Sequence, residues 1–571
     1  MAEIKPVIST ASESSVKFND FYQFAWIKNM GDTTAYVSNK SGITAGGADV
    51  AEVGAGDAVM IVTETDTIYV KGATTLECHA QNFAECPFVD VSITDSALAQ
   101  QVAQNTADIN NIETYLGIYD ADDVAGIYAD FENSIYQRIG RAAGLSAGAD
   151  YDQFGMYGGR KLCNLADNGT VNAWYGDEGY VEDGSNGQVM VYQPKFYYKV
   201  VPISLEQIQP EVIDPEAEVP EYTEPEGYHL KKAYYYISTT KHSGFKCHPA
   251  FIDENGNEMD GIYISAYEGS IWDFSESKYL VYDSCDFVEG TYTAGVYPMD
   301  TAKDKFSSVA GVKPASGNTN LLTRPNIETL CTNRGAGWHS ENLQVASMEQ
   351  MLQIIEYCGF DTQTLIGKGI DSYASGSGNE ASQTGSTASL GNGTGSATST
   401  VHYASDGTMT TDTANGKKAE RYRGRENDWG NICKFINGDN VYGEGKQRGG
   451  VNYYCDDYAY AESKMDGNYH STGITVTNAS GYVRYFGWSE QCDWAFFTTL
   501  TANGATSSKP VGDYTYVTAN LGKTSPAFRV AYLGGSWAAG ATAGAFYWIW
   551  NNGVGTRTRN IGGRLAWFPR S

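Results

Sequence analysis

Short runs in which hydrophobic and polar residues alternate fill the first ninety positions of the chain. Examples are "TAYVSNK", "AVMIVTE" and "TIYVKGA", separated by Gly, Asp and Asn. Alternation with a period of two is typical of strands with one buried face, and the intervening residues are typical of turns. We therefore expect residues 1–92 to form an N-terminal β domain.

The period changes in residues 93–120, where hydrophobic residues follow each other at steps of four and three, as in a coiled coil. β-Branched residues fall at both core positions, which favours three strands, and Asn105 supplies a polar layer that sets the register. We predict a parallel homotrimer; the alternative is a single amphipathic helix lying on a neighbouring domain, because the seam spans only about three heptads. The expected trimerisation residues are Leu98, Val102, Asn105, Ile109, Ile112 and Leu116.

Strand patterns return in residues 121–325, for example in "QVMVYQPKFYYKVVP", and this part reads as a β-rich intermediate module. It contains an acidic, Pro- and Glu-rich loop over 205–227. Helices are expected over 130–145 and over 346–360, the latter with Ser347 as N-cap and Gly359 at its end. The Gly/Ser/Thr-rich stretch 371–415 is expected to be either a long surface loop or a locally mobile segment.

Composition narrows the possible partners. The 571 residues carry a formal net charge of −29 and no block of Lys or Arg, which disfavours nucleic acid. No apolar run approaches the ~20 residues needed to cross a bilayer, and the start has no secretory signal pattern, so we expect no membrane insertion. The ten cysteines include no CxxC pair, so we expect most to be reduced, buried thiols assembled in a reducing cytoplasm.

Sequence patterns for catalysis or metal binding are lacking. HExxH and Walker A patterns do not occur, and the seven histidines are not spaced as a ligand set. "DENGNEMDG" lacks the final Glu of a calcium loop, so a hairpin turn is preferred there. We expect a protein that is not an enzyme and uses no metal or cofactor.

Three C-terminal stretches carry a resemblance: "RYRGRENDWGNICKFINGDN", "FGWSEQCDWAF" and "FRVAYLGGSWAAGATAGAFYWIWNN", the last followed by "NIGGRL". They resemble the C-type-lectin-like fold shared by formylglycine-generating-enzyme-type domains and the variable proteins of diversity-generating retroelements, as found in phage tail fibres. The resemblance covers roughly 150–571. It implies a mainly β protein with an α+β C-terminal part, a receptor-binding domain over 326–571, and a buried Trp429 and Phe435 around Asn431.

In that family the segment after Gly-Gly-x-Trp is a variable region, here about 534–564. Alternation over 545–550 predicts that Trp548 and Trp550 point one way, with Phe546, while Tyr547 and Ile549 point the other way. The glycines at 534, 535, 562 and 563 and Arg564 are expected to be structural. The alternative is that 534–564 is merely a core hairpin and its loop. The resemblance implies these ligand-binding residues, with Tyr547 as anchor: Ser536, Ala538, Ala539, Thr542, Tyr547, Ile549, Asn551, Asn552, Val554, Thr556 and Thr558.

The resemblance implies a virion protein, a trimeric tail or head fibre that binds a host-cell surface receptor, protein or glycan, with avidity from trimerisation. Its N-terminal β domain would anchor it to other virion proteins. One alternative is a structural decoration or head-fibre protein without a receptor role. Another is a cysteine-dependent oxidase or hydrolase, but the pair of reactive thiols found near the C-terminus of one relative has no counterpart after Cys492.

Overall fold

The computed structural model is mainly β and divides into two compact units, Met1–Gly117 and Ile118–Ser571. The expected coiled coil, with Leu98, Val102, Asn105, Ile109, Ile112 and Leu116, lies outside the described residues, as does most of the acidic loop 205–227. The structure describes residues 3–8, 11–18, 24–45, 47, 49–62, 66–72, 74–81, 121–209, 227–279, 299–316, 322–372, 381–399, 402–403, 409–410, 418–445, 449–460, 468–502, 512–523 and 525–569.

Two antiparallel four-stranded sheets form the N-terminal unit. Their facing sides share one hydrophobic core, to which Ile27 and Leu76 contribute from one sheet and Val70 from the other. The three alternating runs found in the sequence are confirmed as strands β4, β6 and β7. The sheets are β1 (Glu3–Ile8), β8 (Thr75–Gln81), β3 (Phe24–Asn29), β6 (Ala58–Val62), and β2 (Ser14–Lys17), β7 (Thr67–Lys71), β4 (Ala35–Ser38), β5 (Ala51–Val53).

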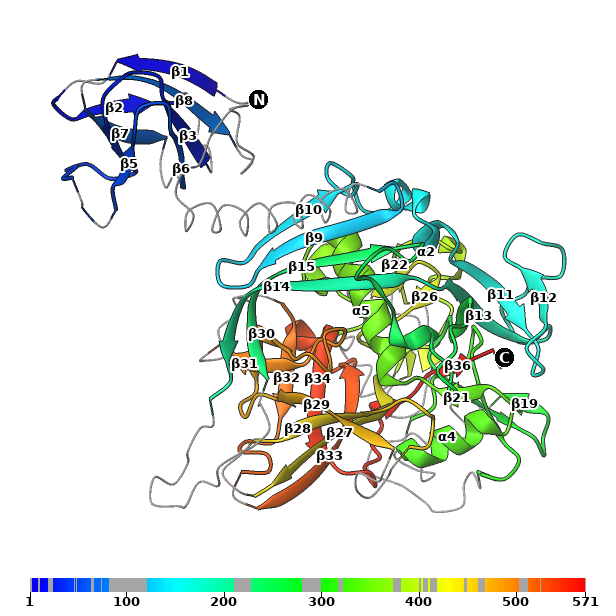
Figure 1. Cartoon of the computed structure of the whole chain (residues 1–571). Coiled ribbons are helices and arrows are strands. Elements are labelled where there is room, and N and C mark those ends of the chain that lie inside the picture. Colours follow the sequence, from blue (N-terminus) through cyan, green and yellow to red (C-terminus); the bar gives the residue numbers. More distant parts are fainter. Residues whose placement is uncertain are drawn as a thin grey trace. The chain divides into compact units, whose positions relative to one another are not determined.

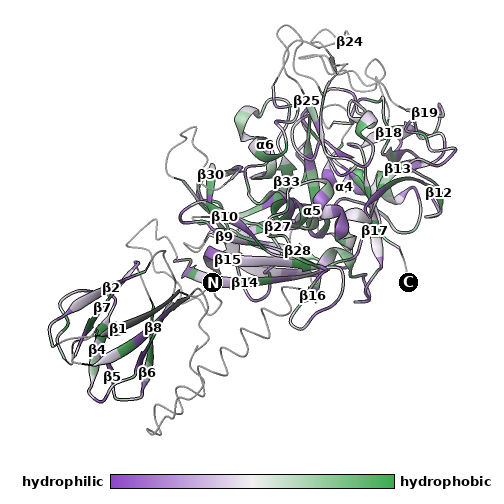
Figure 2. Ribbon diagram, turned by 90° about the horizontal axis from the view of Figure 1, so that it is seen from above, coloured by the Kyte–Doolittle hydropathy of each residue, from purple (hydrophilic) through white to green (hydrophobic). Residues whose placement is uncertain are grey.

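A long mixed sheet organises the larger unit (Figure 1). Hydrophobic residues occur along several of its strands (Figure 2). In order it contains β10 (Ile135–Gly140), β9 (Val124–Asp130), β15 (Tyr228–Ser238), β30 (Gly481–Trp488), β32 (Tyr514–Val517), β34 (Gly544–Asn552), β33 (Pro526–Gly534), β27 (Cys433–Glu444), β28 (Val451–Cys455) and β29 (Tyr469–Thr475). Four more strands attach to it: β14 (Tyr197–Gln207), β16 (Lys246–Cys247), β31 (Thr498–Thr501) and β35 (Ile561–Gly562).

The last strand of the chain belongs to a second sheet, where it lies between two strands from much earlier in the sequence. Together with the pairing of β15 and β30, this joins residues 121–325 and 326–571 into one compact unit, so the expected boundary at 325 does not separate two bodies. The second sheet contains β12 (Val171–Trp174), β11 (Lys161–Leu165), β13 (Gln188–Pro194), β17 (Gly261–Ser265), β36 (Leu565–Trp567) and β21 (Trp338–Ser340).

The remaining elements are short. The small sheets are β19 (Lys278–Tyr279), β18 (Ser270–Asp273), β20 (Lys305–Ser307); β22 (Gly395–Thr398), β25 (Lys418–Tyr422), β26 (Arg425–Glu426); and β23 (His402–Tyr403), β24 (Met409–Thr410). The short helices are η1 (Ala149–Gln153), α2 (Gly155–Gly158), η2 (Pro249–Phe251), α4 (Arg324–Thr332), α6 (Thr362–Leu365), η3 (Ala388–Leu390) and η4 (Gly540–Thr542).

Helix α5 (Leu343–Tyr357) is the expected C-terminal helix, but its N-cap lies five residues earlier than predicted. Asn342 is its N-cap, accepting from the Val345 N–H at 3.0 Å, and Ser347 lies inside the helix. The helix contacts β9 on one side and β27 on another (Figure 1). Its carboxylates are buried with arginines: Glu349 pairs with Arg160, with one N–O distance of 2.9 Å.

The helix predicted over 130–145 is wrong. Its place is taken by the second strand of a hairpin, in which β10 pairs with β9 and Tyr136 lies opposite Ala129. Ser134 turns the chain with a φ of 55°. Because β9 also pairs with β15, pairing within the sheet outweighs the helical preference of this segment.

Eight described cysteines are free thiols and six of these are buried, as expected for reduced cysteines. No helix in the part of the chain that the structure describes has the length and apolar character to cross a membrane.

Candidate functional site

One face of β34 consists of large aromatic side chains without solvent exposure. Phe546, Trp548 and Trp550 are each 0% exposed. The two indole rings stack at 5.4 Å and 6°. The Trp548 indole N–H donates to the Phe496 carbonyl oxygen at 2.9 Å, and that of Trp550 donates to Asp439 Oδ2 at 3.0 Å. This face is a fixed part of the core, as the alternation predicted.

The opposite face of β34 is covered as well. Ile549 is only 6% exposed because it packs into a second hydrophobic cluster that contains Phe435 and Tyr532. Its expected role as a displayed residue is therefore wrong for this chain. Tyr547 is half-buried, with its ring edge-on to Tyr514 at 5.7 Å and 87°. Alternation identified two faces correctly but could not show that distant segments cover both.

Backbone contacts fix the turn after β33. Gly534 has a φ of 96°, and a Cβ there would lie 2.7 Å from the Asp428 carbonyl oxygen. The Gly430 N–H donates to the Gly534 carbonyl at 3.1 Å, and the Trp537 N–H donates to the Asn431 carbonyl at 2.9 Å. Only a residue without a side chain fits at this position, so the expected structural role of Gly534 is confirmed.

Ser536 is part of the same fixed turn and not of the surface. It is 3% exposed, and its Oγ accepts from the Ala538 N–H at 3.3 Å and from Asn560 Nδ2 at 3.4 Å. Its expected display role is wrong because the tight turn directs its side chain inward. Ala538 is exposed, and Ala539 and Thr542 are half-buried.

The segment that begins with the last two residues of β34, which we call the arc (residues 551–560), is different. Its side chains at Asn551, Asn552, Val554, Thr556 and Thr558 are all half-exposed. Its backbone is fixed at several points: the Thr556 N–H donates to the Gly553 carbonyl at 3.1 Å, and the Cys433 N–H donates to the Asn560 carbonyl at 2.8 Å. These five candidates share one anchored segment at the surface, which is irregular after Asn552.

The first residues of the arc are tied to the core through one buried hydroxyl. Tyr532 is 4% exposed, and its hydroxyl contacts Asn551 Oδ1 and accepts from Asn552 Nδ2 at 2.5 Å. Burial raises the Tyr532 pKa well above its usual value. The hydroxyl therefore stays protonated and fixes the side chains of Asn551 and Asn552 at the start of the arc.

A row of tyrosines beside the arc is absent from the sequence-based expectations. Tyr482, Tyr514 and Tyr547 lie on three neighbouring strands, and the first two rings are 5.2 Å apart at 89°. Tyr516, two residues along β32, is 44% exposed. The alternation in "DYTYV" was the available signal, because it places Tyr514 and Tyr516 on one face.

The remaining motif residues confirm a structural role. Trp429 and Phe435 are buried, and Asn431 Oδ1 accepts from the Ser382 N–H at 2.8 Å. Arg564 is 0% exposed and donates to backbone carbonyls, including that of Asn427 at 2.8 Å. It braces the chain and is not available to a ligand.

Reactive chemistry is not favoured near this surface. Burial raises the pKa of the Cys433 and Cys455 thiols to about 12, so neither is a thiolate at neutral pH. Among the described residues, no group of three or more His, Cys, Asp and Glu is placed to hold a metal ion.

The solved structures that align with this chain include the P3c, U1 and M1 variants of a Major Tropism Determinant. The P3c and U1 variants are 11% and 12% identical, each over 76% of this chain and 77% of theirs, with TM-scores of 0.23. The M1 variant is 13% identical over 78% of this chain and 81% of its own, with a TM-score of 0.22. No protein-family model and no curated protein sequence matches. Because these TM-scores are low, the description of the site rests on the residues of this chain alone.

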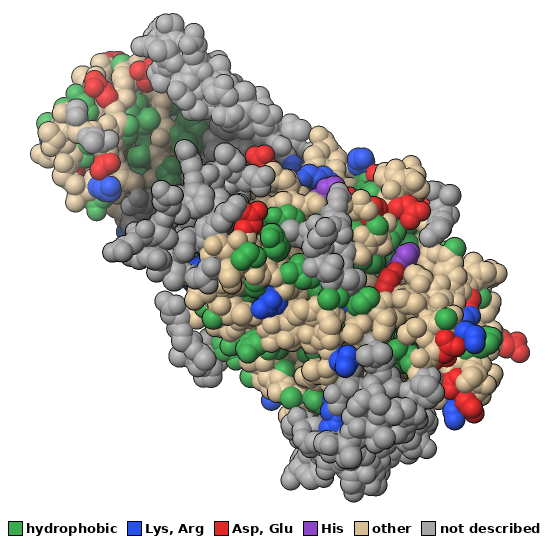
Figure 3. Space-filling view, turned by 90° about the horizontal axis from the view of Figure 1, so that it is seen from below, with side chains coloured by type: hydrophobic (Ala, Val, Ile, Leu, Met, Phe, Trp, Pro, Cys, Tyr) green, Lys and Arg blue, Asp and Glu red, His purple; other side chains and the backbone are tan. Residues whose placement is uncertain are grey.

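The surface around the arc and the tyrosine row has few charged side chains, and those between residues 512 and 560 are all arginines. Asp513 and Lys523 are buried, so Arg529, Arg557 and Arg559 are the described ionisable side chains with exposure between 512 and 560, apart from tyrosine hydroxyls. Viewed from below, the larger unit likewise presents few charged side chains over its middle (Figure 3). Such a surface suits contact through aromatic rings and short polar groups.

Proposed function

We propose that this chain is a bacteriophage virion protein that binds a host-cell surface receptor through the arc and the neighbouring Tyr516 and Tyr547. The observation that carries the proposal is the contrast within a few residues between a core without exposure and an anchored segment of half-exposed side chains. The sequence resemblance to variable proteins of phage tail fibres supports the same reading.

Binding, in this proposal, needs no catalysis, metal or cofactor. Tyr516 and Tyr547 supply rigid aromatic area at low entropy cost, and the asparagines and threonines of the arc supply adaptable hydrogen bonds. A single shallow surface binds weakly, so trimerisation through the seam from Leu98 to Leu116 would raise the apparent affinity. The N-terminal unit would attach the chain to other virion proteins.

Binding of the purified full chain to a panel of bacteria, measured by flow cytometry, tests this function. Val554→Arg together with Thr556→Glu should lower binding at least about tenfold, because buried charges without partners weaken an interface. A matched control, Ile203→Arg with Ser185→Glu, places the same charges at exposed positions outside the arc and should bind normally.

Two results would contradict the proposal. Equal binding by both variants would place the receptor contact elsewhere. Absence of binding to any cell, with normal incorporation into virions, would favour the decoration role instead.

A further inference from the structure

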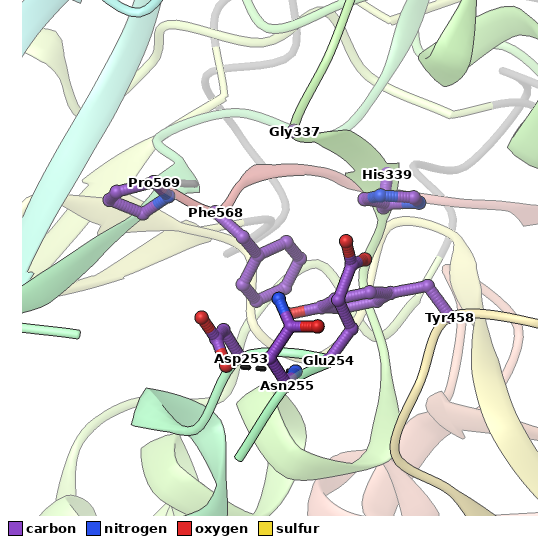
Figure 4. Close-up of a pocket in the computed structure, with 8 residues that line it drawn as sticks. All are labelled: Asp253, Glu254, Asn255, Gly337, His339, Tyr458, Phe568 and Pro569. Atoms are coloured by element: carbon purple, nitrogen blue, oxygen red, sulfur yellow. Dashed lines mark hydrogen bonds between the residues drawn. The ribbon is translucent and has the colours of Figure 1, made fainter. Parts of the chain in front are cut away.

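Two adjoining cavities lie in the larger unit, built by segments other than the arc. One has a volume of about 300 Å³ and the other about 100 Å³. They share Asp253, Glu254, Tyr458 and Phe568 as lining residues. Figure 4 shows the smaller one, in which these side chains converge. The function proposed above uses neither cavity.

Aromatic rings form much of the walls. The rings of Tyr458 and Phe568 lie 4.9 Å apart at 42°, and Tyr458 stacks on His339 at 4.5 Å and 13°. In the larger cavity Tyr454 meets Trp494 edge-on at 5.5 Å and 88°. Aromatic faces carry negative charge density and attract cations.

The charged groups that line the cavities are all acidic. Asp253, Glu254 and Asp456 contribute carboxylates, and no Lys or Arg occurs among the described residues that line either cavity. Asp253 is held in place by the expected hairpin turn, where its Oδ1 accepts from the Asn257 N–H at 2.7 Å. Asp456 lies 3.3 Å from His470 and keeps 56% of its side chain exposed. The lining therefore favours a positively charged ligand.

One buried amide adds an independent observation. Gln344, in the first turn of α5, lines the larger cavity and is 3% exposed. Its Nε2 donates to the Cys455 carbonyl at 2.7 Å, but its Oε1 is buried without a hydrogen-bond partner. A buried acceptor left unpaired costs about 1–3 kcal/mol, so a ligand that donates a hydrogen bond here would be stabilised.

We propose that these cavities bind a primary ammonium group at the end of an aliphatic stem, such as a lysine side chain. The ammonium would donate to Gln344 Oε1 and face the carboxylates of Glu254 and Asp456, while the stem would lie against the rings of Tyr458 and Phe568. An anion would meet only like charge, and a neutral hydroxyl would forgo both the carboxylates and the cation–π attraction. This site is independent of the receptor surface proposed above.

Calorimetric titration of the full chain with Nα-acetyl-L-lysine methylamide tests the site. The matched probe is Nα-acetyl-6-hydroxy-L-norleucine methylamide, in which a hydroxyl replaces the ammonium. We expect the lysine derivative to bind at least about tenfold more tightly, and its affinity to fall as salt is added. Equal affinities, or no binding of the lysine derivative up to about 10 mM, would overturn the inference.

Variants separate a local site from the overall negative charge of the protein. Glu254→Gln with Asp456→Asn should weaken binding of the lysine derivative at least about tenfold. Glu178→Gln with Glu276→Gln makes the same change in net charge at exposed residues outside both cavities and should leave binding unchanged. If the two double variants weaken binding equally, the attraction comes from the overall charge and the proposed site is wrong.

Discussion

Most of strand β34, residues 544–550, and the arc that begins in its last two residues are adjacent in sequence but are held in different ways. In β34 the side chains fix the strand, because Trp548 and Trp550 are buried and each donates a hydrogen bond to an acceptor in the core. In the middle of the arc the backbone turns on itself, from Gly553 to Thr556, and the side chains are half-exposed. The difference shows how a chain can keep one fold while the side chains of a short segment change.

The largest effect expected from this contrast follows loss of an indole. Trp550→Ala should lower the free energy of unfolding of the larger unit by about 3–5 kcal/mol, because it opens a cavity and removes the donor to Asp439. Thr556→Ala in the arc should change it by less than about 0.5 kcal/mol. Denaturant titration followed by circular dichroism measures both, and similar effects would remove the distinction between strand and arc.

A second difference concerns pH. Burial raises the pKa of Asp439, the acceptor beneath Trp550, to about 6 from a usual value of 3.8. A raised pKa in the folded state means that its contribution to stability is fully present below about pH 4 and is lost as the pH rises through 6. Asp439→Asn removes the ionisable carboxyl group. The free energy of unfolding of this variant, relative to that of the wild type, should therefore rise by about 3 kcal/mol between pH 4 and pH 7.5.

A second variant provides the control for these measurements of stability against pH. Thr558→Ala, in the arc, should differ from the wild type by the same amount at every pH because no carboxylate is changed. A pH-independent difference for Asp439→Asn would mean that the carboxylate is ionised throughout and that its two donors, Trp550 and Asn452, outweigh burial.

Glycine substitutions give a matched third comparison. Gly534→Ala should destabilise by about 1–3 kcal/mol, because its φ is 96° and a Cβ would meet the Asp428 carbonyl. At Gly555, in the arc, a Cβ meets nothing within 4 Å. Gly555→Ala should therefore be neutral or stabilise by about 0.4–1 kcal/mol. Equal destabilisation would mean that the arc backbone is as constrained as the turn.

Local sequence signals predicted much of this frame. The alternation over 545–550 identified the face of Trp548 and Trp550, and Gly534 was correctly expected where no side chain fits. Both follow from local geometry, the two-residue period of a strand and the conformational freedom of glycine.

Long-range packing explains what the sequence did not reveal. Ile549 was expected at the surface but is buried against a cluster that includes residues as distant as Cys163 and Leu330. The segment 130–145 was expected to be helical but pairs with β9. The row formed by Tyr482, Tyr514 and Tyr547 depends on which strands become neighbours, and no local pattern specifies that.

The smallest effect is expected when the contacts between Tyr532 and the first residues of the arc are removed. Tyr532→Phe removes the hydroxyl that Asn551 and Asn552 contact, and should lower the free energy of unfolding by about 1 kcal/mol. Hydrogen exchange should become faster in the arc while residues 544–550 of β34 remain protected, because only Asn551 and Asn552 lose a contact. Tyr516→Phe, which removes an exposed hydroxyl on the same face of the sheet, is the matched control and should leave both unchanged.

The outcome decides how independent the arc is. If exchange accelerates only in the arc, the asparagines at its entry are tethers, and replacing them would alter the shape of the surface as well as its chemistry. Substitutions that change the chemistry of the surface but not its shape would then be limited to positions beyond the tether, such as Thr556. If β34 loses protection together with the arc, Tyr532 couples the two, and side-chain changes at the surface would reach the core.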